Sequence, residues 1–470
     1  MRFEYVPGPE ARAVITLHDS YGLFIGGSFV PGSSVFKTIS PATEEVLAEV
    51  TVAGAEDVDA AVAAARHAYE RIWSVMPGRE RGKYLFRIAR LLAERARELA
   101  VLETLDNGMP IVQARDVDVP LASAHFFYHA GWADKLGYAG FGPSPRPLGV
   151  AGQVIPWNFP LLMLAWKIAP ALACGNTVVL KPAETTPLTA LMFGEICQQA
   201  DLPPGVVNIV TGDGATGHSL VAHPGIDKIA FTGSRSVGKE IARLCALSGK
   251  RLTLGLGGKS ANIVFADADV DQAVEGIVDG IFLNQGHVCS AGSRLLVQEQ
   301  AADSFLEALR RRIAGLRLGD PLDANTDIGA INSRVQLDKI TSLVTSGAAD
   351  GASRWSAPCP LPDRGFWFPA TLLTEVPPAA RIVREEIVGP VVSVATFGTP
   401  EEAVAMVNAA PYGLSAGVWT RQGDRLLQMS SALRAGVVWA NSFNRFDPSS
   451  PFGGYKESGF GREGGRHGLE

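Results

Sequence analysis

Residues 177–210 read TVVLKPAETTPLTALMFGEICQQADLPPGVVNIV, with a short run of β-branched residues on each side of a longer apolar stretch. The runs TVVLK and VVNIV have the length and composition of buried strands, and TALMFGEICQQA has the length of a helix. The alternation continues on both sides, with strands predicted at 149–157 and 228–232 and helices at 161–175 and 237–248. Strands and helices at this spacing predict a parallel, doubly wound sheet. The expected fold class is α/β.

A second series of strands and helices begins near residue 261. ANIVF at 261–265 and SRLLVQ at 293–298 are predicted strands, and helices are expected to begin near residues 270 and 301. The glycine-rich stretch LGLGGKS at 254–260 separates the two series and marks a boundary. A chain of 470 residues also exceeds what one hydrophobic core normally serves. We therefore expect two domains and a C-terminal tail, with bounds 1–257, 258–452 and 453–470.

The chain before residue 148 is expected to begin with short strands and turns and then to form helices. FIGGSFV at 24–30 has the alternation and the glycines of a strand and turn. Helices are predicted at 57–73, at 79–105 and at about 120–136. The second is amphipathic along its whole length, and Asn107-Gly108 is expected to end it.

Composition and charge exclude several classes of protein. Hydrophobic residues make up 47% of the chain and charged residues 19%, as in globular proteins. The net charge is −6 with both signs spread along the chain, so we expect no nucleic-acid partner. The N-terminus lacks the pattern of a secretory signal, and no run reaches the roughly twenty apolar residues of a membrane span. We expect no membrane partner.

One of the five cysteines stands apart from the others. The cysteines lie at positions 174, 197, 245, 289 and 359 and never form a CxxC pair, which predicts a reduced, cytoplasmic chain without a metal site. Four of them have ordinary or apolar neighbours and are expected to be small buried hydrophobes. Cys289 lies in NQGHVCSAGSR, where small neighbours let a substrate carbon approach. A thiolate is the reactive form of cysteine, so Cys289 is a candidate nucleophile.

Two glycine-containing turns are candidates for binding a dinucleotide. TGDGATG at 211–217, which includes Gly214, matches the pattern of a dinucleotide loop, but the next strand ends without the expected carboxylate. Its glycines are as well explained by a simple chain reversal. Gly233 and Ser234 lie directly between a predicted strand and helix, where free backbone N–H groups can meet a pyrophosphate.

Lys181 and Glu184, just beyond another predicted strand, can hold ribose hydroxyls between them. The alternative is a strand-end turn with solvated charges.

Six motifs occur in the same order as in a known family. They are PWNFP at 156–160, KPAE at 181–184, FTGS at 231–234, NQGHVCSAGSR at 284–294, EEIVGPV at 385–391 and SPFGGYKESGFGRE at 450–463. With them the chain resembles the aldehyde dehydrogenases over nearly its whole length. The resemblance implies a Rossmann-like cofactor domain in 1–257, a catalytic domain in 258–452, a tail that returns to the cofactor domain, and a small oligomerisation arm. The implied reaction is oxidation of a small-molecule aldehyde by NAD or NADP, through a thiohemiacetal and a thioacyl enzyme.

The resemblance also assigns roles to single residues. Cys289 resembles the nucleophile, and Asn158 resembles the donor to the oxyanion, together with the backbone N–H of Cys289. Glu386 resembles the carboxylate that holds the nicotinamide ribose, although without the resemblance a solvated Glu385–Glu386 pair explains it better. The other positions implied at the cofactor are Ile155, Trp157, Lys181, Glu184, Gly214, Gly233, Ser234, Val237 and Leu256, and those implied at the substrate tunnel are Phe446 and Phe452.

NAD is favoured over NADP, because Glu184 would repel a ribose 2′-phosphate.

One position departs from the family's pattern. The general-base glutamate lies in a motif of the form LELGGK, and this chain has LGLGGK with Gly255 in the place of the glutamate. General-base help is worth a factor of roughly a hundred to ten thousand, and glycine cannot supply it. In one interpretation the thioester is hydrolysed slowly or through another base, for which His287 is a candidate, with Lys167 as a proton relay.

Two further interpretations of Gly255 remain. The acyl group can pass to a thiol such as coenzyme A, which needs no water base. Alternatively, the protein is a non-catalytic scaffold or an engineered form that lacks the base.

The arm also departs from the family's pattern. Residues 134–147 are short and rich in Gly and Pro, and the chain stops at Glu470 soon after GREGG. Glycine and proline oppose strand pairing, so the tetramer built on this arm is in doubt. A homodimer through the helix at 238–248 is expected instead.

Overall fold

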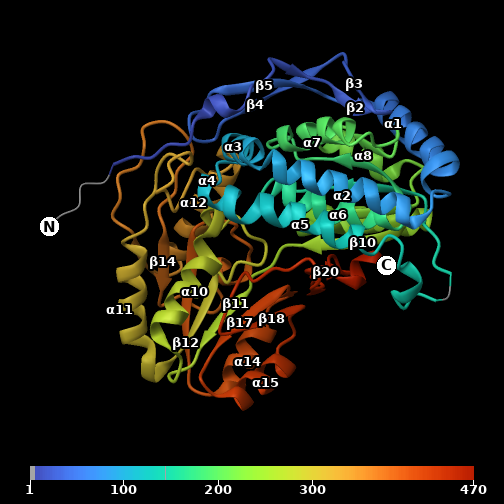
Figure 1. The fold of residues 1–470 in the computed structure, drawn as a ribbon. Helices are drawn as coiled ribbons and strands as arrows, with labels where there is room; N and C mark the ends of the chain where they lie inside the picture. The colour runs from blue at the N-terminus through green and yellow to red at the C-terminus, as the bar shows by residue number, and fades with distance from the viewer. Residues whose placement is uncertain (1–5, 143) are drawn as a thin grey trace.

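The computed structural model describes residues 6–142 and 144–470 and contains two large sheets, each covered by helices (Figure 1). The strand order of the first sheet is β20-β10-β9-β6-β7-β8-β2-β3. Its five central strands are parallel to one another and largely buried, as expected for a sheet covered on both faces. They are β6 Val150–Val154, β7 Thr177–Lys181, β8 Val207–Ile209, β9 Lys228–Gly233 and β10 Arg251–Leu256. The α/β prediction is confirmed.

Helices follow the central strands, as the alternation predicted. They are α6 Pro160–Ala173, which keeps Pro170 inside it, α7 Leu188–Gln199, α8 Gly214–Ala222 and α9 Arg235–Ser248. In sequence order the central strands run fifth, fourth, first, second and third, so the chain reverses its direction of winding between β6 and β9. In open α/β sheets, ligands bind beyond the carboxyl ends of the strands at such a reversal. The segments that follow β6 and β9 therefore border the expected binding crevice.

The N-terminal region differs from its prediction at two helices. A helix α1, Ala55–Ala68, runs into a π-turn at Tyr69–Trp73 as expected, but the predicted helix at 79–105 is two helices, α2 Gly78–Glu94 and α3 Ala96–Asn107. Arg95 leaves the helical conformation between them with ψ 16°, and its side chain pairs with Glu98 and Glu195.

Helix α5, Val119–Ala130, also ends earlier than the predicted residue 136, and a short 3-10 turn follows at Leu136–Tyr138. The remaining short elements of this region are α4 Ile111–Gln113, a π-turn at Ala114–Asp118, a 3-10 turn at Arg12–Val14, and strands β1 Ser20–Tyr21, β2 Leu23–Ile25, β3 Ser28–Val30, β4 Val35–Ile39 and β5 Val46–Thr51.

The second sheet has the order β13-β14-β15-β12-β11-β17-β18 and is parallel except at β13. Its strands are β11 Ala261–Val264, β12 Arg294–Gln298, β13 Ser353–Ser356, β14 Thr371–Thr374, β15 Val391–Phe397, β17 Ser415–Trp419 and β18 Val437–Ala440. Its helices are α10 Val270–Phe282, α11 Ala302–Ile313, α12 Arg334–Ala349, α13 Arg381–Arg384, α14 Pro400–Asn408 and α15 Gly423–Ala432. Helices α10 and α11 begin within one residue of their predicted starts.

The C-terminal tail crosses back to the first sheet (Figure 1). Strand β19, Tyr455–Lys456, pairs with β16, Tyr412–Gly413, and strand β20, Gly459–Phe460, pairs antiparallel with β10. In the last pair Gly255 lies opposite Gly459. The chain then ends in a 3-10 turn at Arg466–Leu469. The tail therefore brings the final motif of the sequence beside the glycine-rich boundary.

Among the described residues, no helix combines the length and the apolar character that crossing a membrane requires.

Candidate active site

A strained turn leads into Cys289. After α10, Asn284 and Gln285 both adopt left-handed backbone conformations, with φ of 48° and 52°. Such conformations cost roughly 1–3 kcal/mol each in residues other than glycine and persist only where the surroundings hold them. The Gln285 side chain supplies part of this restraint. Its amide nitrogen donates to the carbonyl oxygens of Gly108 at 3.2 Å and Ala330 at 3.0 Å, and its oxygen accepts from Gly329 N at 3.1 Å.

Asn158 is held against the same turn. The Asn284 amide donates to the carbonyl oxygen of Asn158 at 2.6 Å, and the Asn107 amide donates to that oxygen at 3.4 Å. The Asn158 amide in turn donates to the carbonyl oxygen of His287 at 2.8 Å, two residues before Cys289. One N–H of the amide is used in this bond. The amide nitrogen carries a second N–H, which this bond does not use.

Cys289 lines a narrow internal cavity of about 20 Å³, which is room for about one water molecule. The other lining residues come from α6, β9, β10, the link between β16 and β17, and the tail: Met163, Trp166, Thr232, Thr253, Leu254, Gly255, Leu256, Leu414, Phe452, Gly453, Gly461 and Glu463. Phe452 stacks on Trp166 with ring centroids 5.3 Å apart. Phe446 does not line the cavity but packs against both rings, at 5.5 Å from Phe452 and 6.0 Å from Trp166.

The thiol of Cys289 is protonated in this environment. Burial, followed by the charge of Glu386, raises its pKa to about 12, and the charge of Glu463 adds a smaller rise. The backbone N–H of Ser290 acts in the opposite direction. Because a thiol is a weak nucleophile, the sulfur needs a further change in its surroundings before it reacts.

Glu386 lies directly against the glycine loop after β10. It accepts a hydrogen bond from the backbone N–H of Gly258, and burial raises its pKa above the ordinary value. A Cβ atom added to Gly257 would stand 2.1 Å from both carboxylate oxygens, so a side chain at position 257 would displace the carboxylate. The glycine loop therefore allows Glu386 to approach the region of Cys289.

His287 is not placed to act as a base. It is fully buried, and its ring packs edge-on against Trp157 with centroids 4.7 Å apart. Burial lowers its pKa to about 3, and neither ring nitrogen has a hydrogen-bond partner among the described residues. His287 is also absent from the lining of the Cys289 cavity. A weakly basic group outside the cavity does not fill the role left by Gly255, so the structure argues against His287 as the base and leaves hydrolysis through another base open.

Lys167 and Glu463 form a buried ion pair at the cavity. The Lys167 side chain has no exposed surface, pairs with the Glu463 carboxylate, and donates to the Thr232 hydroxyl at 2.8 Å. A Cβ atom added to Gly255 would lie 2.9 Å from the same hydroxyl. The sequence had suggested Lys167 as a relay but had assigned no role to Glu463, although this glutamate ends the quoted motif SPFGGYKESGFGRE.

The expected dinucleotide residues lie at the carboxyl ends of the parallel strands. Ile155 and Trp157 follow β6, Lys181 ends β7, and Leu256 ends β10. Lys181 Nζ lies 3.5 Å from the Glu184 carboxylate.

The turn between β9 and α9 presents Gly233 at the strand end and Ser234 as the N-cap. The Ser234 hydroxyl accepts from Val237 N at 3.4 Å. This helix start, at the reversal between β6 and β9, is suited to a phosphate group.

The TGDGATG turn is less suited to a phosphate. Helix α8 begins at Gly214, and the Asp213 carboxylate caps it by accepting from Ala215 N at 2.8 Å. A carboxylate already occupies this helix start and would repel a phosphate. This favours the alternative interpretation, in which the glycines reverse the chain between β8 and α8.

A family model described as "Aldehyde dehydrogenase family" matches residues 29–470. The chain belongs to this family. This aldehyde dehydrogenase is 44% identical over 460 residues to one from Davidiella tassiana, with 95% of this chain and 92% of that protein covered. It is 46% identical over 448 residues to retinal dehydrogenase 2 of Homo sapiens, with 93% and 86% covered. A solved aldehyde dehydrogenase from Bacillus cereus, described as an NAD+ complex, superposes with a TM-score of 0.94 at 41% identity, covering 98% of this chain and 97% of that one.

The raised pKa of Cys289 gives a test of its environment. In aldehyde dehydrogenase without cofactor, the rate at which iodoacetamide alkylates Cys289 should rise about tenfold per pH unit from about pH 7 to about pH 9, because only the thiolate reacts. Mass spectrometry of the Cys289 peptide measures this rate. A Cys289→Ala protein is the control and gives the rate at which the other four cysteines are alkylated. A rate that levels off below about pH 9 would contradict the assigned environment.

Proposed function

We propose that this aldehyde dehydrogenase oxidises an aldehyde with NAD through a covalent thioester on Cys289. The observation that carries the proposal is the position of Cys289, on a narrow cavity beside the Asn158 loop at the reversal of the first sheet. A thiol, an amide donor and a dinucleotide crevice are the groups that this reaction needs. A scaffold protein needs none of them together.

The residues of the crevice fit NAD. The start of α9 offers backbone N–H groups at Ser234 to a pyrophosphate, and helix α9 packs closely on β10 because Gly238 lacks a side chain. A Cβ atom at Gly238 would stand 2.4 Å from Leu256. Lys181 and Glu184 would hold the adenosine ribose, and Glu386 the nicotinamide ribose. NAD, when bound, supplies the acceptor for the hydride.

The chain's own groups perform the covalent steps. The Cys289 thiol gives its proton to water as the sulfur bonds to the carbonyl carbon, and the oxygen that becomes negative accepts hydrogen bonds from the second N–H of the Asn158 amide and from the backbone N–H of Cys289. Such donors typically contribute roughly 3–4 kcal/mol at the transition state. Loss of hydride then leaves an acyl group on the sulfur. Trp166 and Phe452 enclose the reacting carbon in an apolar cavity that excludes bulk water.

Release of the acyl group is the step that Gly255 affects. No carboxylate stands at position 255, so deacylation is slower than with the family's base or uses another route. Transfer to coenzyme A is the second candidate route. It is supported by the Gly255 position alone, since a thiol acceptor needs no base to activate water.

A single experiment separates these routes. Enzyme mixed with NAD and excess reactive aldehyde in a stopped-flow instrument should give a burst of NADH, one per active site, because acylation precedes the slower deacylation. A steady phase that coenzyme A accelerates would support acyl transfer. Cys289→Ala is the control and should abolish the burst. Absence of a burst in the unaltered enzyme, with no steady turnover, would remove the proposed function.

The preference for NAD over NADP depends on Glu184 in this proposal. Glu184→Gln should improve kcat/KM for NADP relative to NAD by about fivefold or more, because two like charges about 4 Å apart in water repel by about 1 kcal/mol. Glu195→Gln, a carboxylate on α7 away from the crevice, is the matched control. An unchanged ratio of the two kcat/KM values in Glu184→Gln would show that Glu184 does not contact the ribose.

We further propose a homodimer formed through α9. The helix leaves Val237 and Leu247 exposed, at 43% and 88%, and exposed apolar side chains on one helix support a contact between copies. Leu247→Asp should shift the protein toward the monomer in analytical ultracentrifugation, while Leu427→Asp, at a leucine of α15 that is 72% exposed, should not. A dimer that survives Leu247→Asp at low protein concentration would exclude this interface.

We also propose a cytoplasmic location, which the free thiol state of all five cysteines in the described chain supports. Fractionation of the source cells tests this location, and activity found in the secreted fraction would contradict it.

A further inference from the structure

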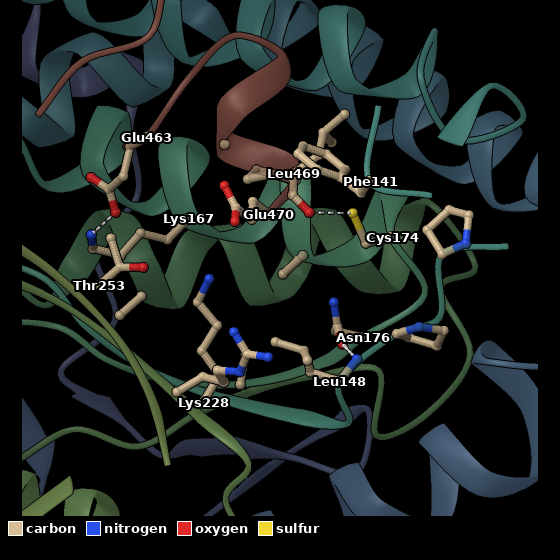
Figure 2. Close-up of a pocket in the computed structure, with 18 of the residues that line it drawn as sticks. Phe141, Leu148, Lys167, Cys174, Asn176, Lys228, Thr253, Glu463, Leu469 and Glu470 are labelled. Carbon is tan, nitrogen blue, oxygen red and sulfur yellow. Dashed lines mark hydrogen bonds and ion pairs between the residues drawn. The ribbon is translucent and has the colours of Figure 1, made fainter. Parts of the chain in front are cut away.

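A second, larger cavity lies behind the catalytic one. Its volume is about 490 Å³, and it lies between α6 and the first sheet, with Lys228 on its floor and Glu470 facing it from the tail (Figure 2). Lys228 of β9 and Arg251 of β10 line this cavity. Thr232 and Gly255, further along the same two strands and separated by an even number of residues, line the catalytic cavity. Because alternate residues of a strand face the same side, the two cavities follow one another along one face of the sheet.

Three residues line both cavities: Trp166, Thr253 and Glu463. Glu463 is the only one of the three that carries a carboxylate, the kind of group that accepts a proton in general-base catalysis. It is also the only carboxylate among the described residues that line the catalytic cavity. A base for the deacylating water must reach the thioester on one side and release its proton to water on the other. Glu463 borders both spaces.

The backbone of Glu463 is fixed in this position. Its N–H donates to the carbonyl oxygen of Phe452 at 2.8 Å, and its own carbonyl oxygen accepts from Phe452 N at 2.7 Å. The carboxylate is only 13% exposed and pairs with Lys167, as Figure 2 shows. The negative charge of Glu463 contributes to the raised pKa of the Cys289 thiol. The carboxylate therefore lines the same cavity as the sulfur, and its ion pair with Lys167 orients it.

Gly255 leaves this wall of the catalytic cavity without a side chain. The cavity holds about 20 Å³, enough for one water molecule between the sulfur and the wall. The Cβ atom of a larger residue at position 255 would lie 2.9 Å from the Thr232 hydroxyl oxygen, and the rest of that side chain would extend into this space.

On the basis of the proposed function, we propose that Glu463 is the base that activates the deacylating water, which enters from the larger cavity. The Glu463 carboxylate takes a proton from the water as the water oxygen bonds to the thioester carbon. The carbon–sulfur bond then breaks, which releases the carboxylic acid and returns the Cys289 thiolate. Glu463 passes its proton to water in the larger cavity. Lys167 is a positioning residue, because it holds the carboxylate without contacting the substrate.

The test compares acylation with turnover in one instrument. Glu463→Gln keeps the size of the side chain and removes its charge. It should leave the NADH burst at about one per site and lower the steady rate by about a hundredfold or more, the usual range for loss of a general base. Glu275→Gln is the matched control, because Glu275 also forms an ion pair, with Arg312, but lines neither cavity, and its steady rate should stay within about twofold of the unaltered enzyme.

Two further variants distinguish a base from a structural ion pair. Glu463→Gln leaves Lys167 buried without its counter-charge, which can destabilise the fold. The double variant Lys167→Gln/Glu463→Gln removes both charges and should show the same selective loss of steady turnover. The steady rate of the double variant Gly255→Glu/Glu463→Gln should be at least about tenfold higher than that of Glu463→Gln alone, because a carboxylate returns to the same cavity.

The outcomes separate this inference from the proposed function. A normal burst with an unchanged steady rate in Glu463→Gln, or turnover that depends on coenzyme A, would overturn the role of Glu463 and leave the Cys289 chemistry in place. Failure of Gly255→Glu to restore turnover would also overturn it. The lack of both a burst and steady turnover in the unaltered enzyme would instead refute the proposed function itself.

Discussion

The backbone carbonyl oxygen of Asn158 joins the parts of the site. It accepts hydrogen bonds from Asn107, at the end of α3, and from Asn284, in the turn before Cys289. The Asn158 side chain then donates to His287, so the loop after β6 and the cysteine segment bind each other in both directions. All of these groups are buried, where losing one partner costs the desolvation of the other. The relative position of thiol and amide therefore depends on this small network.

The network also explains how an unfavourable backbone persists. Asn284 and Gln285 are the two non-glycine residues with positive φ in the turn, and both side chains are used to hold it. Gln285 reaches the end of α3 and the segment around Ala330, which belongs to the second half of the chain. Hydrogen bonds that connect distant segments thus offset the strain, and they also fix the position of Cys289.

Local patterns were enough to predict the parallel strands and most helices, because a buried run such as TVVLK has few alternatives. The break at Arg95 was not readable, since the amphipathic period continues through it and only the pairing with Glu195 of α7 gives a reason for it. Motifs placed Cys289 and Asn158 near each other through resemblance rather than through any local rule.

The sequence did not predict which side chains surround Cys289 in space. His287 is close to Cys289 along the chain, but its ring packs against Trp157 instead of the cavity. Glu463 is far from Cys289 in the sequence and reaches the site only because β20 pairs with β10, where Gly459 lies opposite Gly255. Spacing along the chain cannot reveal a contact created by the return of the tail.

The returning tail also makes the space around the thiol a joint product of distant segments. Cys289 reaches it from the second half of the chain, Thr232 and Gly255 from the first sheet, and Phe452 and Glu463 from the tail. Phe452 and Glu463 are bonded to each other through their backbones, and β20, between them in sequence, pairs with β10. The shape of the space around the sulfur is therefore coupled to the outer edge of the first sheet.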